Sequence, residues 1–226
     1  MDPLPVLSRT ALFQGIPAGE LEPLAAAARV RTYTAGSYLF HEGDPAGVLY
    51  VIMRGQVKIA RMGTGGNEAV FAVLLPGDSF GEVSLFDDEP VRSMDAEAME
   101  PTECLTLERQ ALLDFLERNP AAVRHIIRVL CGHLRRVDES FSEAVFLDIP
   151  GRVARKLLDL AAEHGQKTSQ GVRIDMHLTQ RTLAGMVAAS RENVNRALSR
   201  LAGRGDIIQE AGYITIVRPA ELRKRS

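Results

Sequence analysis

Residues 178–201 read LTQRTLAGMVAASRENVNRALSRL, and this stretch decides how the C-terminal part of the chain is built. Apolar side chains recur at helical spacing in two groups, separated by a tight turn at Ala188–Ala189. Ser190 stands directly before the second group, where its hydroxyl can cap a helix. The inward faces consist of Leu183, Met186 and Val187 in the first helix and Val194, Ala197, Leu198 and Leu201 in the second. The stretch therefore predicts a helix-turn-helix.

The other faces of the second predicted helix carry groups that can bond to base edges. Arg191, Glu192 and Arg196 share its N-terminal part, and Asn195 and Arg200 lie near them. Arginine offers paired donors to guanine O6 and N7, and glutamate accepts from cytosine N4. A recognition helix inserts its first turns into the major groove, so these groups could reach bases together. Taken alone, the pattern also fits the solvated charged face of an ordinary helix.

The segments around this stretch complete a winged helix. The predicted elements are a helix at 153–162, a polar loop at 165–171, a strand at 172–176 and a hairpin formed by 207–208 and 213–216. Residues 149–226 hold fourteen Lys and Arg against seven Asp and Glu, a net charge of +7, while residues 1–148 carry −9. This asymmetry suggests that the C-terminal part meets a polyanion.

A long helix is predicted over residues 121–147. Asn119 is a suitable N-cap, and Pro120 suits the first helical position. A heptad stripe follows, made by Val123, Ile127, Leu130, Leu134, Val137 and Phe141. We expect the stripe to pair with the same helix of a second subunit. Packing on the chain's own barrel is the alternative, and residues 148–151 are expected to break the helix as a linker.

The N-terminal part changes from helix to strands. A helical segment is predicted within residues 12–30. Short strands follow at 38–40, 48–52, 56–61 and 70–75, with turns at 42–44, 54–55, 63–66 and 76–78. Many short strands joined by Gly, Pro and Asp turns indicate a β-barrel, sandwich or jelly roll.

A second chemical signal lies at Phe80–Phe86, followed by Arg92 and Ser93. The Gly-rich turn can bring backbone N–H groups to an anion, and the arginine can fork onto phosphate oxygens. Glu82 suits a ribose hydroxyl as an acceptor. The alternative is a barrel turn with a salt bridge between Glu82 and Arg92.

Composition excludes several classes of protein. No apolar run approaches the ~20 residues of a membrane span, and the first residues lack the pattern of a secretory signal. Two isolated cysteines, Cys104 and Cys131, fit a reducing cytoplasm and argue against a disulfide framework or an iron–sulfur cluster. The five histidines are scattered, which does not support a metal or haem site. Nucleotide-binding, hydrolase and metalloprotease motifs are absent, so an enzyme is not expected.

The helix-turn-helix, from Leu178–Gln180 to Ser190–Arg196, resembles that of the CRP/FNR family of transcription regulators. The resemblance covers nearly the whole chain, from Leu12–Phe13 through Gly36, Gly43, Gly55 and Gly77 to the wing. It implies TGTGA-type half-sites, with Arg191 and Arg196 on guanines, Glu192 on a cytosine, and Thr179 and Ser190 on phosphates. Ala188 departs from the glycine that relatives usually have in the turn. A left-handed conformation there would cost alanine on the order of 1 kcal/mol.

The segment from Gly81–Glu82 to Arg92–Ser93 is similar to the phosphate-binding cassette of the family's cyclic-nucleotide-binding barrel. The resemblance implies that Arg92 and Ser93 bind the cyclic phosphate, and that Gly81 and Glu82 bind the ribose, with Val83 and Ser84 in the same turn. Serine after the arginine favours cAMP over cGMP. The adenine-contacting positions are Val137 and Asp138. Valine cannot hydrogen-bond the base amino group, whereas Asp138 could accept from N6.

The sequence thus predicts an α+β chain: a sensor barrel (jelly roll) of the cyclic-nucleotide-binding type at 1–118, a dimerisation helix and hinge at 119–148, and a winged-helix DNA-binding domain at 149–226. The expected function is cAMP-activated, sequence-specific binding of palindromic operators as a cytoplasmic homodimer, with RNA polymerase as a partner. Two alternatives stay open. One is a ligand-independent or differently liganded regulator, and the other is a cyclic-nucleotide-responsive regulatory subunit that does not bind DNA.

Overall fold

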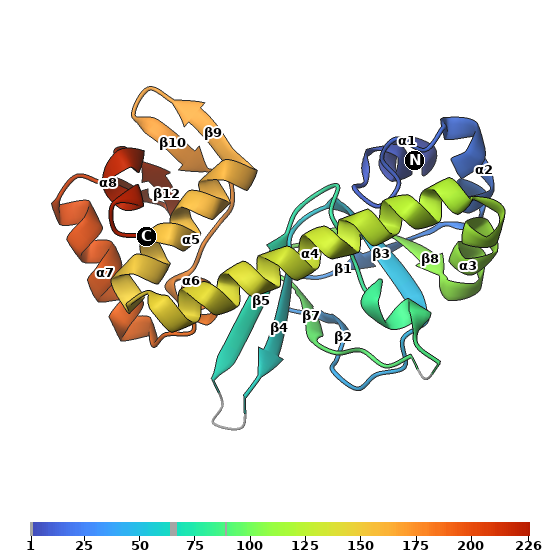
Figure 1. Ribbon diagram of the computed structural model, residues 1–226, viewed down its shortest axis with the longest axis horizontal. Helices are drawn as coiled ribbons and strands as arrows, with labels where there is room; N and C mark the ends of the chain where they lie inside the picture. The colour runs from blue at the N-terminus through green and yellow to red at the C-terminus, as the bar shows by residue number, and fades with distance from the viewer. Residues whose placement is uncertain (1, 64–66, 89) are drawn as a thin grey trace. The chain divides into compact units, whose positions relative to one another are not determined.

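The computed structural model describes residues 2–63, 67–88 and 90–226, which form two compact units (Figure 1). The first unit holds the described residues of 1–62 and 71–135, and the second holds those of 63–70 and 136–226. Residues 64–66 of the predicted turn at 63–66 lie outside the described residues. No helix of the part that the structure describes is long and apolar enough to cross a membrane.

The first unit is built on two four-stranded sheets, with strand orders β1-β8-β3-β6 and β2-β7-β4-β5. The first sheet consists of β1 (Arg29–Tyr33), β8 (Thr102–Glu108), β3 (Val48–Arg54) and β6 (Ser79–Phe80), all paired antiparallel. The second consists of β2 (Tyr38–Phe40), β7 (Asp95–Ala98), β4 (Val57–Met62) and β5 (Glu68–Leu74). The expected antiparallel β architecture and α+β class are confirmed.

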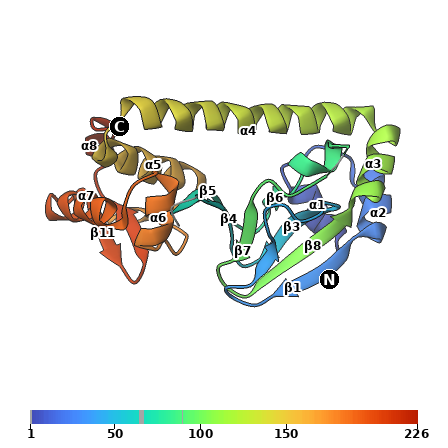
Figure 2. The ribbon, with the colours of Figure 1, turned by 90° about the horizontal axis from the view of Figure 1, so that it is seen from below.

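Two apolar clusters hold this unit together. Between the sheets lies a cluster made by Tyr50, Ile52, Val57, Phe80, Ala96 and Cys104. The second cluster joins the first sheet to three helices at one end of the unit, which are α1 (Leu4–Arg9), α2 (Ala18–Ala27) and α3 (Arg109–Arg118). Helices α2 and α3 lie side by side (Figure 2). Buried leucines of both helices and strands fill it, including Leu24, Leu49, Leu105 and Leu112.

The N-terminal helical prediction was too long. Within 12–30 only Ala18–Ala27 is helical, because Ala28 is extended and Arg29 begins strand β1 by pairing with Thr106. The sequence also gave no separate prediction for β7, β8 or α3. The two strands are central in their sheets, and α3 directly precedes the long helix α4 (Pro120–Phe146).

The long helix α4 spans Pro120–Phe146, which is 27 residues, and confirms the prediction. Its heptad stripe divides into two parts. Val123 and Leu130 pack against the apolar cluster of the first unit, next to the buried Ala122 and Ile126. The stripe side chains that stay exposed are Ile127, Leu134, Val137 and Phe141. The chain's own sandwich therefore covers part of the stripe and leaves the remainder exposed.

The second unit is a winged helix. Its elements are α5 (Ile149–His164), β9 (Gly165–Thr168), β10 (Gly171–Ile174), α6 (Gln180–Met186), α7 (Arg191–Gly203), β11 (Ile207–Glu210), β12 (Tyr213–Ile216) and α8 (Pro219–Arg223). The strands form one sheet in the order β11-β12-β10-β9. Two predictions were wrong in detail. The polar loop at 165–171 contains strand β9, paired with β10, and residues 149–151 are the first turn of α5, capped by Asp148.

Candidate functional site

Arg92 is the centre of the candidate effector site. It lies in the segment that joins η1 (Val83–Phe86) to β7, and its side chain is 4% exposed. Its Nη1 donates to the Gly81 carbonyl oxygen at 3.2 Å, and its Nη2 donates to the Val48 carbonyl oxygen at 2.7 Å. The guanidinium also lies over the Phe40 ring, 4.2 Å from its centroid. These contacts hold a cation at the base of the cassette turn.

Burial lowers the pKa of the Arg92 guanidinium below its ordinary value, and nearby Tyr50, Asp44 and Glu82 oppose that shift. An arginine in a protein nevertheless stays protonated. A buried positive charge that lacks a full set of partners is costly, and an anion bound beside it would offset that cost. The electrostatics therefore suit a phosphate.

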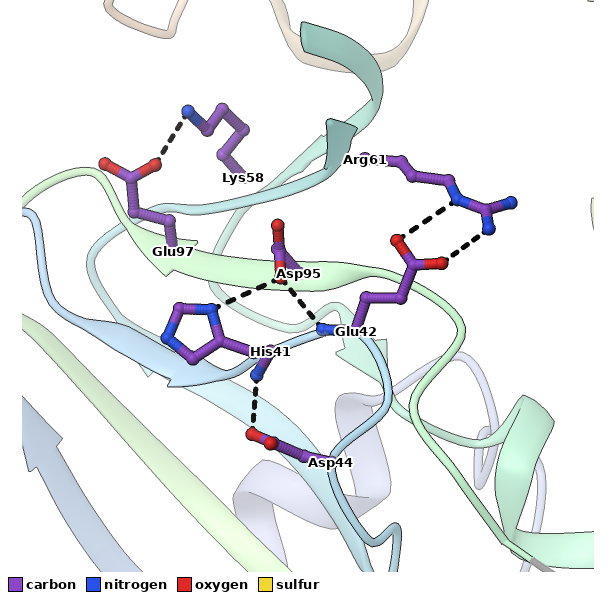
Figure 3. Close-up of polar contacts among 7 residues, drawn as sticks. All are labelled: His41, Glu42, Asp44, Lys58, Arg61, Asp95 and Glu97. Carbon is purple, nitrogen blue, oxygen red and sulfur yellow. Dashed lines mark hydrogen bonds and ion pairs between the residues drawn. The ribbon is translucent and has the colours of Figure 1, made fainter. Parts of the chain in front are cut away.

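The backbone of Arg92 is held by the turn at residues 41–44. The Arg92 N–H donates to the Asp44 carbonyl oxygen at 2.8 Å, and the Gly43 N–H donates to the Arg92 carbonyl oxygen at 2.8 Å. Figure 3 shows how side chains fix this turn: Asp44 accepts from the His41 N–H, and Asp95 of β7 accepts from the Glu42 N–H, each at 2.8 Å. Two further ion pairs lie nearby: Lys58–Glu97 joins β4 to its neighbour β7, and Arg61–Glu42 joins β4 to this turn (Figure 3).

Two buried polar atoms of the cassette have no hydrogen-bond partner among the described residues. They are Nε of Arg92 and Oε2 of Glu82. The other oxygen of Glu82, Oε1, lies 3.6 Å from Nδ1 of His133 on α4. Arg92 therefore pairs with carbonyl groups and Glu82 faces His133, in place of the simple Glu82–Arg92 salt bridge. A free donor on Arg92 and a free acceptor on Glu82 fit a phosphate and a ribose hydroxyl.

The structure brings six of the predicted effector-site residues into one segment of the sandwich. Gly81, Glu82, Val83 and Ser84 form the turn into η1, and Arg92 and Ser93 follow it. The side chains of Glu82, Ser84 and Arg92 are buried, whereas those of Val83 and Ser93 are exposed. The other two predicted residues, Val137 and Asp138, are exposed on the part of α4 that belongs to the second unit.

The predicted helix-turn-helix is present, with both helix starts capped by side chains. The Thr179 hydroxyl accepts from the Thr182 N–H at 3.0 Å, and the Ser190 hydroxyl accepts from the Asn193 N–H at 3.3 Å. Side chains of Val194, Ala197, Leu198 and Leu201 are buried, as the spacing predicted. The apolar faces thus fix α7 on α5 and α6 and leave its opposite face free.

The turn between α6 and α7 holds Ala188 at φ +48°, in the left-handed region expected from the departure at this position. Arg152 of α5 reaches this turn. Its Nη1 donates to the carbonyl oxygen of Val187 at 2.7 Å and lies 3.5 Å from that of Ala188. Sequence reasoning missed Arg152, because no local pattern links two residues 35 positions apart.

The predicted DNA-contacting side chains form an exposed set on α6 and α7: Thr179, Ser190, Arg191, Glu192, Asn195 and Arg196. Hydrogen bonds from its own backbone N–H and from Ser190 hold the pKa of Glu192 below its usual value, so this side chain is a charged acceptor. The Arg196 guanidinium bonds to Asn193 Oδ1, and the Gln180 amide bonds to Asn195. Sequence reasoning also missed Gln180, whose position at the start of α6 was the available signal.

The chain combines three features. They are a jelly-roll sensor in which a buried arginine bonds to a glycine turn, a long helix with an exposed apolar stripe, and a winged helix. Together they define the class of a ligand-responsive DNA-binding regulator. Residues 30–119 match the family model of the cyclic nucleotide-binding domain, and residues 151–225 match that of the Crp-like helix-turn-helix domain. The chain therefore belongs to the CRP/FNR family, whose members are transcription regulators that bind DNA and act as dimers, and not enzymes.

Known relatives match this chain over most of its length. The CRP-like cAMP-activated global transcriptional regulator of Mycobacterium tuberculosis is 34% identical over 221 residues, which covers 98% of each chain. The cyclic AMP receptor protein of Thermus thermophilus is 32% identical, covering 94% of this chain and 95% of the relative. The structure of the c-di-GMP-responsive global regulator CLP of Xanthomonas campestris matches with a TM-score of 0.76 and 26% identity, covering 88% of this chain and 99% of that chain. These matches exclude the alternative of a regulatory subunit that does not bind DNA.

Proposed function

We propose that this regulator is activated by cAMP, which binds in the cassette formed by residues 81–84 and 92–93. The observation that carries the proposal is the buried Arg92 guanidinium next to the buried Glu82, because Nε of Arg92 and Oε2 of Glu82 have no hydrogen-bond partner among the described residues. The cyclic phosphate would accept from Arg92 and from the exposed Ser93 hydroxyl, and the ribose hydroxyl would donate to Glu82. The names of the Mycobacterium tuberculosis and Thermus thermophilus relatives both refer to cAMP and support the same effector.

The base end of the effector is assigned to α4. Asp138 can accept a hydrogen bond from the adenine N6 amino group, and the apolar Val137 can contact the ring. A regulator with another effector, or with none, is the second candidate. Val137 favours it because valine offers no hydrogen bond to a base, and the CLP structure shows that this fold also serves a c-di-GMP-responsive regulator.

We propose further that the chain binds a palindromic TGTGA-like operator as a homodimer. Arg191 and Arg196 would each fork onto a guanine, Glu192 would accept from a cytosine, and the capping hydroxyls of Thr179 and Ser190 would contact phosphates. A dimer with two-fold symmetry places two recognition helices in successive major grooves, so the half-sites form an inverted repeat.

RNA polymerase is the expected protein partner. The free thiols of Cys104 and Cys131 suit a reducing cytoplasm.

The test combines calorimetric titration of the full chain with cAMP and cGMP and selection of binding sites from random duplex DNA. We expect cAMP to bind, cGMP to bind more weakly, and cAMP to strengthen binding to an inverted repeat. Arg92→Lys should lose most cAMP affinity, because a lysine cannot reproduce the paired donors. Wild-type protein that binds the same inverted repeat but no cyclic nucleotide would establish the second candidate.

A further inference from the structure

Gln180 and Asn195 form an amide pair that links the two helices of the DNA-reading motif. Gln180 is the first residue of α6, directly after the Thr179 cap, and Asn195 lies one turn into α7. The Nε2 group of Gln180 donates to Oδ1 of Asn195 at 3.2 Å. Asn195 is exposed and Gln180 is partly exposed, so the pair lies on the surface that carries the recognition residues.

The direction of this hydrogen bond decides what Asn195 presents to a partner. A free asparagine amide offers both an acceptor oxygen and a donor NH2 group, and rotation about its last torsion exchanges the two. Here the bond from Gln180 holds Oδ1 toward α6, so the Nδ2 group is the end of the amide that is turned away from Gln180. Asn195 therefore presents a hydrogen-bond donor.

Asn195 shares a helix face with one of the predicted guanine-reading residues. It follows Arg191 by four positions, and residues four apart are neighbours on one face of a helix. If α7 places Arg191 in the major groove, it therefore also brings Asn195 to that groove, at a neighbouring base pair. This step rests on the proposed function of α7 as the recognition helix.

We infer that Asn195 is a specificity-determining residue, held by Gln180 so that it donates to an acceptor on a base. In the major groove guanine presents two acceptors and thymine one, adenine presents an acceptor beside an amino donor, and cytosine presents an amino donor. Recognition of adenine by asparagine uses both ends of the amide, and the Gln180 bond engages one of them. The pair thus favours guanine or thymine at one position of each half-site and selects against cytosine. Because Gln180 orients the amide before DNA binds, less side-chain freedom is lost on binding.

Substitutions at Gln180 test the orientation directly, in the full chain, by selection from random duplex DNA with and without cAMP. Asn195→Ala should remove the preference at one position of each half-site, about fivefold to tenfold in relative affinity, and leave the neighbouring positions unchanged. Gln180→Ala should move that position toward adenine, because Asn195 can then use both ends of its amide. Gln180→Glu should move it toward cytosine or adenine, because a carboxylate accepts from Nδ2 and turns Oδ1 toward the base.

The matched control is Gln170→Glu, which adds the same charge in the exposed turn between β9 and β10 and should leave the motif unchanged. A motif that stays the same in all three variants at Gln180 and Asn195, while Arg191→Ala alters it, would overturn the inference and leave the proposed function standing. Wild-type protein that selects no inverted repeat in either condition would overturn both.

Discussion

The Nη1 group of Arg92 donates to the carbonyl oxygen of Gly81 at 3.2 Å, so the side chain proposed to bind the effector's phosphate also holds the turn proposed to surround it. The contact needs glycine in two ways. Gly81 has φ +87°, and a Cβ built on it would lie 2.5 Å from that same Nη1. Any larger residue would push the guanidinium out of its present position.

Gly81→Ala should therefore damage the effector site more than it damages the fold. We expect cAMP affinity to fall more than tenfold. Gly36→Ala is the matched control, because Gly36 also has a positive φ of +77° and a Cβ there would meet no atom of the described residues within 4 Å, apart from its chain neighbours. Both variants should lose roughly 1–2 kcal/mol of stability from backbone strain. Thermal unfolding with calorimetric titration separates the two effects, and equal cAMP affinity in both variants would show that Arg92 does not depend on Gly81.

The sequence predicted features that are local and missed those that depend on distant contacts. The Ser190 cap, the spacing of α7 and the extent of α4 follow from patterns within a few turns of helix, and the structure confirms them. The resemblance supplied the cassette pairing of Gly81 and Arg92. Strand β7, with its short Asp-Ala-Glu-Ala pattern, owes its place to pairing with β2 and β4, because alanine and acidic residues are poor strand formers.

Arg152 should stabilise the turn of the DNA-reading motif. Arg152→Met keeps the apolar stem and removes the donors to Val187 and Ala188, which should cost about 1–3 kcal/mol and weaken operator binding. Ala188→Gly removes the left-handed strain and should restore part of the loss. Thermal unfolding of both single variants and the double variant forms a double-mutant cycle. Strictly additive effects would mean that Arg152 does not support the strained turn.

Alkaline pH should destabilise the protein through Cys104. Burial raises the pKa of this thiol from an ordinary value near 9.0 to about 12, and its side chain is fully buried between the sheets. Between those two values the folded chain keeps a proton that the unfolded chain loses, so stability falls as pH rises. The slope approaches roughly 1.4 kcal/mol per pH unit for one such group. Tyr33, whose pKa burial also raises to about 12, adds to the slope above pH ~10.

The measurement is denaturant unfolding at pH 8 and pH 10 for wild type and Cys104→Ala. The variant is expected to be less stable at both values because of the lost packing, but to lose less stability between them. Cys131→Ala is the control, because that thiol is exposed. An identical pH dependence in Cys104→Ala and wild type would show that Cys104 titrates normally.

The last prediction concerns the exposed part of the α4 stripe. Leu134, Val137 and Phe141 are 62%, 60% and 71% exposed in the single chain, which is unusual for three aligned apolar side chains. The heptad spacing fits a second copy of the same helix. Leu130 also belongs to the stripe but packs on the first unit, so a charge there would disturb the fold as well as the dimer.

Leu134→Asp combined with Phe141→Asp should therefore give a folded monomer. A monomer presents one recognition helix, so operator affinity should fall by about a hundredfold or more. Ser142→Asp is the control for an added aspartate, since it places one such charge at an exposed α4 position off the stripe. Light scattering gives the mass, and circular dichroism checks that the fold is kept. A double variant that still has the mass of a dimer would place the dimer contact elsewhere, and the exposed stripe would then need a different partner.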